Sequence, residues 1–315
     1  MNKETPLVSV SVVTYNHKDY IEQCLNGILM QETTFPFEII LGEDESHDGT
    51  REICIDYANK YPDKIKLFLR SRKDVIYING NPTGRYNMIE NLKACKGKYI
   101  ALCEGDDYWT DPLKLQKQVD FLEANSDYAI CFHEAKVLFE KPWPYRVTYY
   151  KDFKWNVLDE NKTVYNVDKV FHGPFMATAS VVFRVPKNFS IPNWFVEVQS
   201  GDIVLSALVT AGNKIKYLSE SMSVYRKHIG GVTEYHKGNS IILNRLLSLK
   251  YLNNYFNNQY IVEIKRSAKS YILNDLKYVS FKEYLFLLKL YFTSNVVNIK
   301  WIFKSIKRDL KKDVK

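Results

Sequence analysis

The chain has 315 residues, 46% of them hydrophobic, which is enough to bury a sizeable core and excludes a chain that is disordered as a whole. Its net charge of +8 is uneven, since residues 231–315 hold 16 Lys and Arg against 6 Asp and Glu, whereas the rest holds 28 against 30. No run approaches the roughly 18 apolar residues of a membrane-spanning helix. The first residues lack the pattern of a signal peptide, so we expect a cytoplasmic protein.

The first half of the sequence alternates between strand and helix patterns. Apolar, β-branched runs of strand character cover residues 7–15, 37–44, 64–69, 98–103 and 128–133. Helical patterns lie between them, at residues 17–31, 46–62, 85–96 and 111–125. Strands separated by helices form right-handed βαβ units, so we predict an α/β fold with a doubly wound, mostly parallel sheet. Ligands bind at the carboxyl ends of the strands in such sheets.

Beyond residue 133 the pattern is less regular. Residues 134–175 are rich in Trp, Pro and Tyr, and predict hairpins and loops over one edge of the sheet. A strand, a helix and a group of short strands are expected next, at residues 178–185, 201–212 and 214–228. From about Thr233 onward the pattern is helical. We therefore expect a main domain of residues 1–232 and a basic, aromatic-rich helical extension of residues 233–315.

Two clusters of carboxylates fall where predicted strands end, Glu43-Asp44 and Glu104–Asp107. Glu104 and Asp106, two residues apart on an extended strand end, point the same way, and Gly105 between them lets a ligand or backbone approach closely. Carboxylates on one face suit a hard divalent cation, Mg²⁺ or Mn²⁺, whose shell is completed by water and phosphate oxygens. The alternative is that these acids only form a turn.

Asp44 lies at a strand end within the segment "GEDESHDGT". There it would accept hydrogen bonds from a nucleobase N–H or a ribose hydroxyl, as acids do in other doubly wound nucleotide-binding folds. The segment is neither a G-x-G-x-x-G fingerprint nor a P-loop. Phosphates are therefore expected to be held by a metal ion rather than by a glycine-rich cradle.

Three segments in this order resemble family 2 glycosyltransferases of the GT-A fold. They are "VSVSVVTYNHKDYIEQCLNGILMQ", "EIILGEDESHDGT" and "GKYIALCEGDDYW", which correspond to the family's T-Y-N, D-D-G-S-x-D-G-T and L-D-x-D-D patterns. The matches cover residues 7–131, and weaker ones continue to about residue 233. The resemblance implies a nucleotide-sugar donor and an inverting transfer to an acceptor hydroxyl. Two residues depart from the pattern: Glu45 replaces a usual Gly, and Glu104 replaces the first Asp of D-x-D.

The resemblance also implies roles for residues of these segments. The base pocket would be lined by Thr14, Tyr15 and Asn16. Asp44 would bind the base or the ribose. Glu104 and Asp106 occupy the D-x-D positions, with Asp106 as the metal ligand that grips the diphosphate. Asp107 would lie near the donor sugar.

Four downstream residues match the family more locally. Arg85 would contact the base or the diphosphate, with a solvated helical residue as the alternative. Asp202, at a helix start, matches the family's general base, with an N-cap carboxylate as the alternative. In "VYRKHIGGVT", Arg226 would neutralise phosphate charge, and His228 would ligate the metal or contact the diphosphate. A histidine with a purely structural role is the alternative there.

The basic extension contains an apolar stripe at helical spacing, formed by Ile299, Ile302, Phe303, Ile306 and Leu310. Such a stripe fits an amphipathic helix on an anionic membrane surface, or one docked on the main domain. No nucleic-acid-binding motif accompanies the basic residues, so no nucleic-acid partner is expected.

We hypothesise a cytoplasmic, Mn²⁺- or Mg²⁺-dependent inverting glycosyltransferase that works peripherally at the inner face of the cell membrane. It would move a sugar from a UDP-sugar to a hydroxyl of a glycan or lipid-linked acceptor in the synthesis of cell-surface polysaccharide. One alternative is a non-catalytic module of the same fold that binds a sugar nucleotide or a glycan. Another is a peripheral membrane adaptor that depends on the basic extension.

Overall fold

The computed structural model describes residues 5–141, 143–154, 156–159, 161–231 and 240–275. Within these residues a mixed sheet of ten strands forms the centre of the molecule. Its main path runs β10 (Val164–Tyr165), β12 (Lys214–Lys227), β8 (Tyr128–Phe139), β11 (Val182–Arg184), β6 (Tyr99–Glu104), β1 (Val8–Thr14), β2 (Phe37–Glu43) and β3 (Ile65–Leu69). Beside this path, β7 (Tyr108–Trp109) pairs with β12 and β9 (Arg146–Tyr149) pairs with β8. A separate hairpin consists of β4 (Ile76–Ile78) and β5 (Asn81–Thr83).

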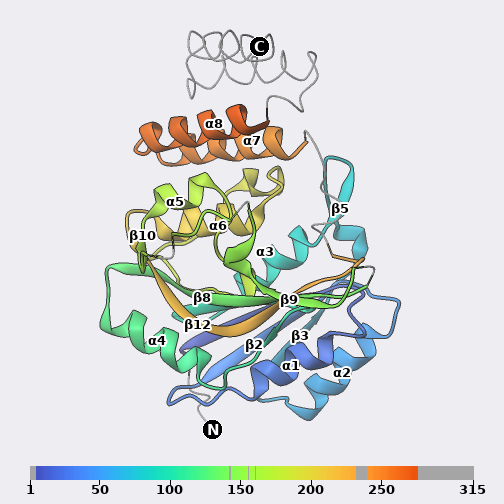
Figure 1. Ribbon diagram of the computed structural model, residues 1–315. Helices are drawn as coiled ribbons and strands as arrows, with labels where there is room; N and C mark the ends of the chain where they lie inside the picture. Colours follow the sequence, from blue (N-terminus) through green and yellow to red (C-terminus); the bar gives the residue numbers. More distant parts are fainter. Residues whose placement is uncertain (1–4, 142, 155, 160, 232–239, 276–315) are drawn as a thin grey trace.

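Helices cover both faces of this sheet (Figure 1), which confirms the predicted doubly wound arrangement. One face carries α1 (Ile21–Leu29), α2 (Thr50–Lys60) and α4 (Lys114–Ala124). The other carries α3 (Arg85–Ala94), α5 (Val167–His172) and α6 (Gly201–Thr210), with α7 (Ser240–Tyr255) and α8 (Ile261–Asp275) stacked beyond them. Among the helices that the structure describes, none combines the length and the apolar character needed to cross a membrane.

The strands β3, β2, β1 and β6 are parallel to one another. β2 is buried along its whole length and β1 along nearly all of it, which explains why both read as continuous apolar, β-branched runs. Because the strands are parallel, their carboxyl ends lie together along one side of the sheet, the carboxyl edge. The register places Thr14 opposite Glu43, and Val13 opposite Glu104. The predicted strand-end acids therefore share this edge.

The second half of the sheet differs from the prediction in two strands. Residues 214–228, expected to form short strands, form the single 14-residue strand β12. Its register against β8 shifts near Ser221, so its buried positions change from odd numbers (Ile215, Tyr217) to even ones (Met222, Val224). This bulge interrupts the alternation from which a continuous strand is recognised. The strand expected at 128–133 also extends further, to Phe139.

Residues 134–175, expected to hold only hairpins and loops, contain the helix α5. Its six residues are too few to show a helical period in the sequence. The helices α7 and α8 belong to the predicted extension, and both pack over α5 and α6 (Figure 1). They add buried side chains to the same hydrophobic cluster as α5 and α6, namely Leu249, Leu252, Ile264, Ala268 and Tyr271. The apolar stripe predicted at residues 299–310 lies outside the described residues.

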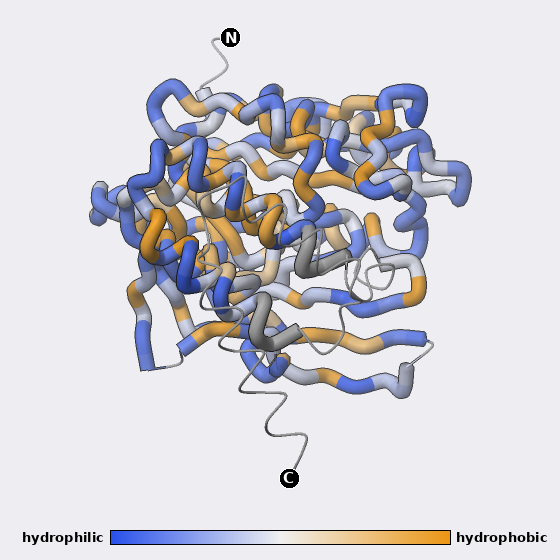
Figure 2. Tube along the Cα trace, turned by 90° about the horizontal axis from the view of Figure 1, so that it is seen from above, coloured by the Kyte–Doolittle hydropathy of each residue, from blue (hydrophilic) through white to orange (hydrophobic). Residues whose placement is uncertain are grey.

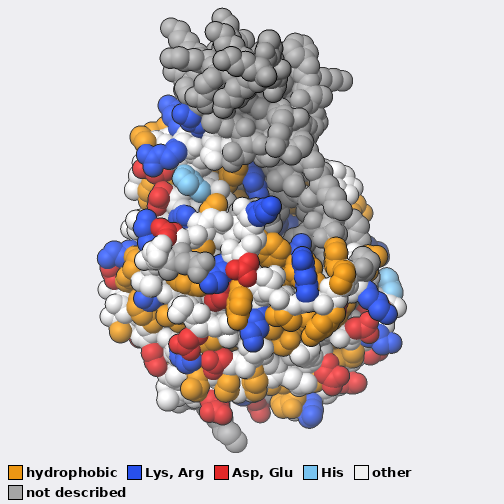
Figure 3. All heavy atoms as spheres, viewed as in Figure 1, with side chains coloured by type: hydrophobic (Ala, Val, Ile, Leu, Met, Phe, Trp, Pro, Cys, Tyr) orange, Lys and Arg blue, Asp and Glu red, His pale blue; other side chains and the backbone are white. Residues whose placement is uncertain are grey.

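Polar and apolar residues are largely separated in this fold. Viewed from above, hydrophilic segments surround the molecule and apolar stretches run through its centre (Figure 2). Around the edge strand β9, however, Tyr145, Val147 and Tyr149 are exposed. Figure 3 shows hydrophobic side chains gathered in the middle of the corresponding face, with charged side chains around them. The next residue, Tyr150, begins a short 3-10 turn (Tyr150–Asp152) that turns toward the carboxyl edge of the sheet.

Candidate active site

Four segments that are far apart in the sequence meet at the carboxyl edge of the parallel strands. Three of them follow the strands β1, β2 and β6, at residues 15–20, 44–49 and 105–107. The fourth is the carboxyl end of β12, at residues 226–228. Hydrogen bonds connect them: the Asp44 N–H donates to the Thr14 carbonyl at 3.1 Å, and the Arg226 N–H donates to Asp107 Oδ1 at 2.9 Å. The fold thus assembles both predicted acid clusters into one region.

Asp106 is flanked by two imidazoles. His228 Nε2 lies 3.1 Å from Asp106 Oδ2, and His17 Nε2 lies 3.7 Å from the same oxygen. Burial alone would raise the pKa of Asp106, but the charge of His17 and the hydrogen bond from His228 outweigh it and hold this pKa below its ordinary value. Asp106 is therefore the carboxylate of the cluster that stays ionised.

The two other acids of the cluster behave differently. Burial, with the neighbouring charges of Asp106 and Asp202, raises the pKa of Glu104 to about 8. Burial, with the charges of Asp106 and Glu104, raises the pKa of Asp107 well above its ordinary value. The cluster thus combines one acid whose pKa is lowered with two whose pKa values are raised, which lessens the repulsion among the three. A bound cation would favour their ionised forms.

Arg226 supports the loop that carries Asp106. Its side chain is buried, and Nη1 donates to the Asp106 carbonyl oxygen at 2.6 Å. The guanidinium also donates to Gln23 and lies over the ring of Tyr108, 4.4 Å from its centroid. Arg226 therefore places a positive charge directly beside the acid cluster.

Gly105 allows the loops after β1 and β6 to approach closely. A methyl group at this position would lie 2.6 Å from Thr14 Oγ1 and 3.0 Å from His17 Nδ1. The close approach predicted for this glycine is thus made by backbone and side chains of the β1 loop. Any larger residue would separate Thr14 and His17 from Asp106.

At the other end of the region, Asp44 and Tyr15 share a partner that the sequence did not suggest. Arg72 Nη1 donates to Asp44 Oδ2 at 2.7 Å, and its guanidinium lies 4.1 Å from the centroid of the Tyr15 ring. Burial raises the pKa of Asp44, although Arg72 opposes that shift. The half-exposed Tyr15 ring and this ion pair form a surface suited to a planar base.

Two residues with positive φ shape the neighbouring turns. Glu45, where the family usually has Gly, adopts φ +62°, a left-handed conformation that explains the usual glycine. Its carboxylate accepts hydrogen bonds from the Arg72 N–H at 2.5 Å and the Ser71 hydroxyl at 3.1 Å, which offset the strain. Asn16, at φ +54°, accepts a hydrogen bond from the His47 N–H at 3.2 Å. Asn16 therefore joins the loops that follow β1 and β2.

Arg85 is buried, so the alternative of a solvated helical residue is wrong. Its guanidinium donates to the carbonyl oxygens of Phe195, Val198 and Gln199 at 3.1, 3.0 and 2.9 Å. Burial lowers its pKa to about 10, although the charge of Asp202 opposes this shift. Arg85 thus anchors the segment that leads into α6, and through it the position of Asp202.

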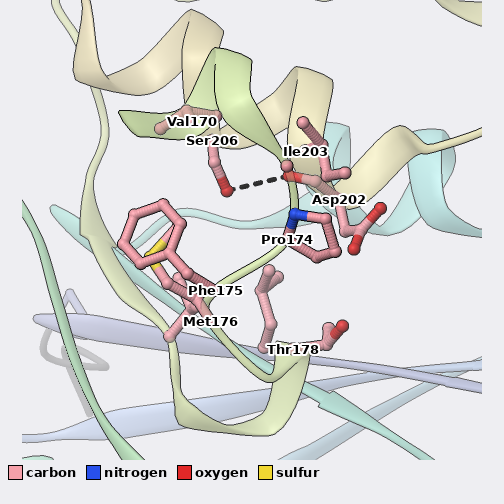
Figure 4. Close-up of a pocket in the computed structure, with 11 residues that line it drawn as sticks. Val170, Pro174, Phe175, Met176, Thr178, Asp202, Ile203 and Ser206 are labelled. Carbon is pink, nitrogen blue, oxygen red and sulfur yellow. Dashed lines mark hydrogen bonds between the residues drawn. The ribbon is translucent and has the colours of Figure 1, made fainter. Parts of the chain in front are cut away.

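Asp202 lies in the first turn of α6 and is half-buried. The N-cap position belongs to Ser200 and no side chain caps this helix, so the alternative of an N-cap carboxylate is wrong. Asp202 lines a small cavity of about 20 Å³ (Figure 4). Figure 4 shows its carboxylate at one end of this cavity, beside Pro174 and Ile203. A carboxylate next to a largely apolar cavity is well placed to meet a substrate group.

A divalent cation fits this site only if a bound ligand supplies part of its coordination shell. Among the residues that the structure describes, no three His, Cys, Asp or Glu side chains are arranged to hold a metal ion. Asp106 and His228 nevertheless lie side by side, and the buried Asp107 Oδ2 has no hydrogen-bond partner. Mg²⁺-type ions commonly take one or two protein ligands and complete their shell with water and phosphate oxygens. The donor set therefore fits a cation shared with a phosphate group.

Sequence reasoning missed three residues of this region. The histidines show no metal-ligand spacing that would single out His17, and Arg72 lies in a segment without a motif. The third is Tyr150, whose pKa is raised well above its ordinary value by burial, followed by the charges of Asp202, Tyr225 and Glu104. Only His17 had a signal in the sequence, since it directly follows the T-Y-N motif.

Buried polar atoms without a hydrogen-bond partner gather at this edge. Four such atoms are Thr14 Oγ1, His17 Nδ1, Asp44 Oδ1 and Asp107 Oδ2. Arg226 Nε makes no hydrogen bond but lies 3.5 Å from Glu140 Oε1, in an ion pair. Native proteins leave few buried polar groups unpaired, and each such group calls for an explanation. Four in one region make this edge of the sheet the candidate ligand site.

Comparisons with known proteins show the family to which the chain belongs. Residues 9–184, more than half of the chain, match the family described as glycosyl transferase family 2. An uncharacterized protein of Mycobacterium tuberculosis (strain ATCC 25618 / H37Rv) is 34% identical over 232 residues, which are 71% of this chain and 60% of that protein. TuaG of Bacillus subtilis (strain 168), described as a teichuronic acid biosynthesis glycosyltransferase, is 34% identical over 126 residues, 40% of this chain and 46% of TuaG. The chain spans less than two thirds of the length of these relatives.

A solved structure extends the comparison to the fold. S. aureus TarS 1–349, in complex with UDP-GlcNAc, superposes with a TM-score of 0.60 at 15% sequence identity, covering 90% of this chain and 79% of that chain. At this level of sequence identity the likeness concerns the fold alone. The chain therefore belongs to glycosyltransferase family 2 and has the GT-A fold.

Proposed function

We propose that this protein is an inverting, Mn²⁺- or Mg²⁺-dependent glycosyltransferase. It transfers a sugar from a UDP-sugar to a hydroxyl of a glycan or lipid-linked acceptor in the synthesis of cell-surface polysaccharide, in the cytoplasm at the inner face of the membrane. Membership of family 2 supports the transfer of a sugar. The description of TuaG supports the polysaccharide, and the UDP-GlcNAc bound to TarS supports the donor.

The observation that carries the proposal is the set of four unpaired polar atoms along the carboxyl edge, on Thr14, His17, Asp44 and Asp107. At the nucleotide end, Tyr15 and Arg72 supply a flat surface and Asp44 Oδ1 supplies a free acceptor for a base or ribose group. At the diphosphate end, Asp106 and His228 lie together with Arg226 beside them. These groups match the parts of a nucleotide-diphosphate sugar in order.

The chemistry is one displacement at the anomeric carbon. Asp202 takes the proton of the acceptor hydroxyl, whose oxygen forms a bond to the anomeric carbon while the bond to the diphosphate breaks. The diphosphate leaves with the electron pair, and the configuration inverts. When bound by Asp106 and His228, a divalent cation supplies charge that stabilises the leaving diphosphate. Asp202 belongs to a different segment from Asp106, as attack from the opposite side requires.

Three further groups surround the transferred sugar in this proposal. Glu104, at the carboxyl end of β6, offers its carboxyl group as a hydrogen-bond partner for a sugar hydroxyl. Asp107 lies behind it and fixes the Arg226 backbone. The small cavity beside Asp202, lined largely by apolar side chains such as Pro174, has room for one hydroxyl-sized group, which suits the acceptor hydroxyl.

The test is a panel of UDP-, GDP-, ADP- and dTDP-sugars with Mn²⁺, Mg²⁺ or EDTA, read by nucleotide release. We expect release from a UDP-sugar that depends on the metal. Asp202→Asn should keep nucleotide binding but lose transfer by at least about 10²-fold, because general-base catalysis typically supplies that much. Asp127→Asn, an exposed residue paired with Lys214, is the matched control and should remain active. Donor binding without release by the wild-type protein would identify a non-catalytic module instead.

A further inference from the structure

Building on the proposed function, we propose that His17 contacts the donor diphosphate through a hydrogen bond from its Nε2–H. The imidazoles of His17 and His228 both lie beside Asp106 Oδ2 and pack edge to face, with ring centroids 6.2 Å apart and ring planes at 85°. His228 Nε2 is within hydrogen-bond distance of that oxygen at 3.1 Å. His17 Nε2 lies 3.7 Å from the same oxygen, which is too far for a hydrogen bond, so its N–H remains available to a ligand.

The backbone of His17 is fixed on both sides. Its N–H donates to Thr50 Oγ1 at 2.8 Å, which ties it to the start of α2. Its carbonyl accepts from the N–H groups of Tyr20 and Ile21 at 2.9 and 2.8 Å, which ties it to the start of α1. Its ring rests beside Gly105, where a methyl group would come within 3.0 Å of Nδ1. The imidazole therefore points into the diphosphate end of the site from a rigid base.

The surroundings of the ring determine which nitrogen carries the proton. Nδ1 is buried and has no hydrogen-bond partner. A buried N–H without an acceptor is less tolerated than a buried acceptor without a donor. In its neutral form, as in its protonated form beside the ionised Asp106, the ring therefore carries a proton on Nε2, which faces the Asp106 carboxylate. An N–H in this position can donate to a phosphate oxygen, whereas Asp106 can approach a phosphate only through a cation.

This role makes a specific prediction about nucleotide binding. The affinities of UDP, GDP, ADP and dTDP and of the matching monophosphates are measured by calorimetry, with Mn²⁺ and with EDTA. His17→Ala should weaken binding of the preferred diphosphate about tenfold, as expected for one hydrogen bond to a charged group, and leave the monophosphate nearly unchanged. The difference should persist in EDTA because the contact does not pass through the metal.

Two conservative variants separate a contact from a structural role. The amide nitrogen of Gln reaches about as far as Nε2, so His17→Gln should restore most of the affinity. The amide of Asn reaches only as far as Nδ1, so His17→Asn should behave like His17→Ala. The control is His47→Ala, which removes an exposed imidazole from the neighbouring loop while keeping the backbone bond to Asn16. It should bind diphosphates like the wild-type protein.

Each other outcome would overturn the role of His17. Equal losses of affinity for diphosphate and monophosphate would mean that His17 acts at the nucleoside end or on the fold. A loss of affinity seen only with Mn²⁺ would mean that His17 acts through the metal ion. If His17→Ala does not fold, equal affinities of the Gln and Asn variants would overturn the proposal. A wild-type protein that prefers diphosphates, with a fully active His17→Ala variant, would refute this role alone. A wild-type protein that binds none of the four diphosphates would refute the proposed function itself.

Discussion

Gly105 offers a direct test of how the site is assembled. In Gly105→Ala the new methyl group would lie 2.6 Å from Thr14 Oγ1 and 2.7 Å from Thr14 Cβ. Carbon atoms in contact normally stay about 3.5–4.0 Å apart, so the loop after β1 must withdraw by about 1 Å. That loop carries Tyr15 and His17, so both ends of the donor site move relative to Asp106.

The size of the effect follows from this displacement. A misplacement of about 1 Å near the reacting centre typically costs about 10²-fold in rate, and overpacking costs about 1–3 kcal/mol of stability. Nucleotide release gives kcat, and urea unfolding gives the free energy of unfolding. The control is Gly84→Ala, since no atom lies within 4 Å of a methyl group there and φ is an ordinary −76°. If Gly105→Ala retains activity within threefold of the wild-type protein, the close approach is not required.

Three further substitutions test other parts of the structure. Arg85→Met leaves three buried carbonyl oxygens without their donor, so we expect the free energy of unfolding to fall by about 3 kcal/mol and transfer to slow; unchanged urea midpoints would contradict the anchoring role. Lys114 is buried, and burial lowers its pKa to about 7. Between pH 7 and 10 the Lys114 side chain holds a proton in the unfolded chain but not in the folded one, so the free energy of unfolding rises with pH by up to about 4 kcal/mol. Lys114→Met should abolish that rise in a pH series of urea unfolding. A rise that survives in Lys114→Met would show that Lys114 does not cause it. Glu45→Gly relieves the positive φ but loses the hydrogen bonds to Ser71 and Arg72, so stability should stay within about 1 kcal/mol while UDP binding weakens severalfold; unchanged UDP affinity would show that Glu45 does not position Arg72.

Much of this fold is readable from the sequence because its signals are local. Buried parallel strands such as β1 and β2 need apolar residues on both faces, and the acids that follow them stand out against that background. The turn conformation at Glu45, by contrast, was visible only as a departure from the family's usual glycine. Local patterns therefore locate the strands and one edge of the site.

The features that were missed depend on contacts between distant segments. The bulge in β12 is set by pairing with β8, which the residues of β12 do not encode alone. Arg85 was expected to contact the base or the diphosphate, or to be a solvated helical residue, whereas its hydrogen bonds are made to carbonyl groups more than 100 positions later in the chain. His17 and His228 have no sequence spacing in common, and only the fold brings them to one carboxylate. Sequence patterns cannot report such relationships.

The most direct test of the proposed function is the metal-dependent release of UDP from a UDP-sugar by wild-type protein and by Asp106→Asn. The substitution keeps the shape of the side chain and removes the one carboxylate that stays ionised in the cluster. We predict that wild-type protein releases UDP with Mn²⁺ or Mg²⁺ but not with EDTA, and that Asp106→Asn loses this metal-dependent release. Full metal-dependent release by Asp106→Asn would contradict the assignment of the diphosphate end of the site.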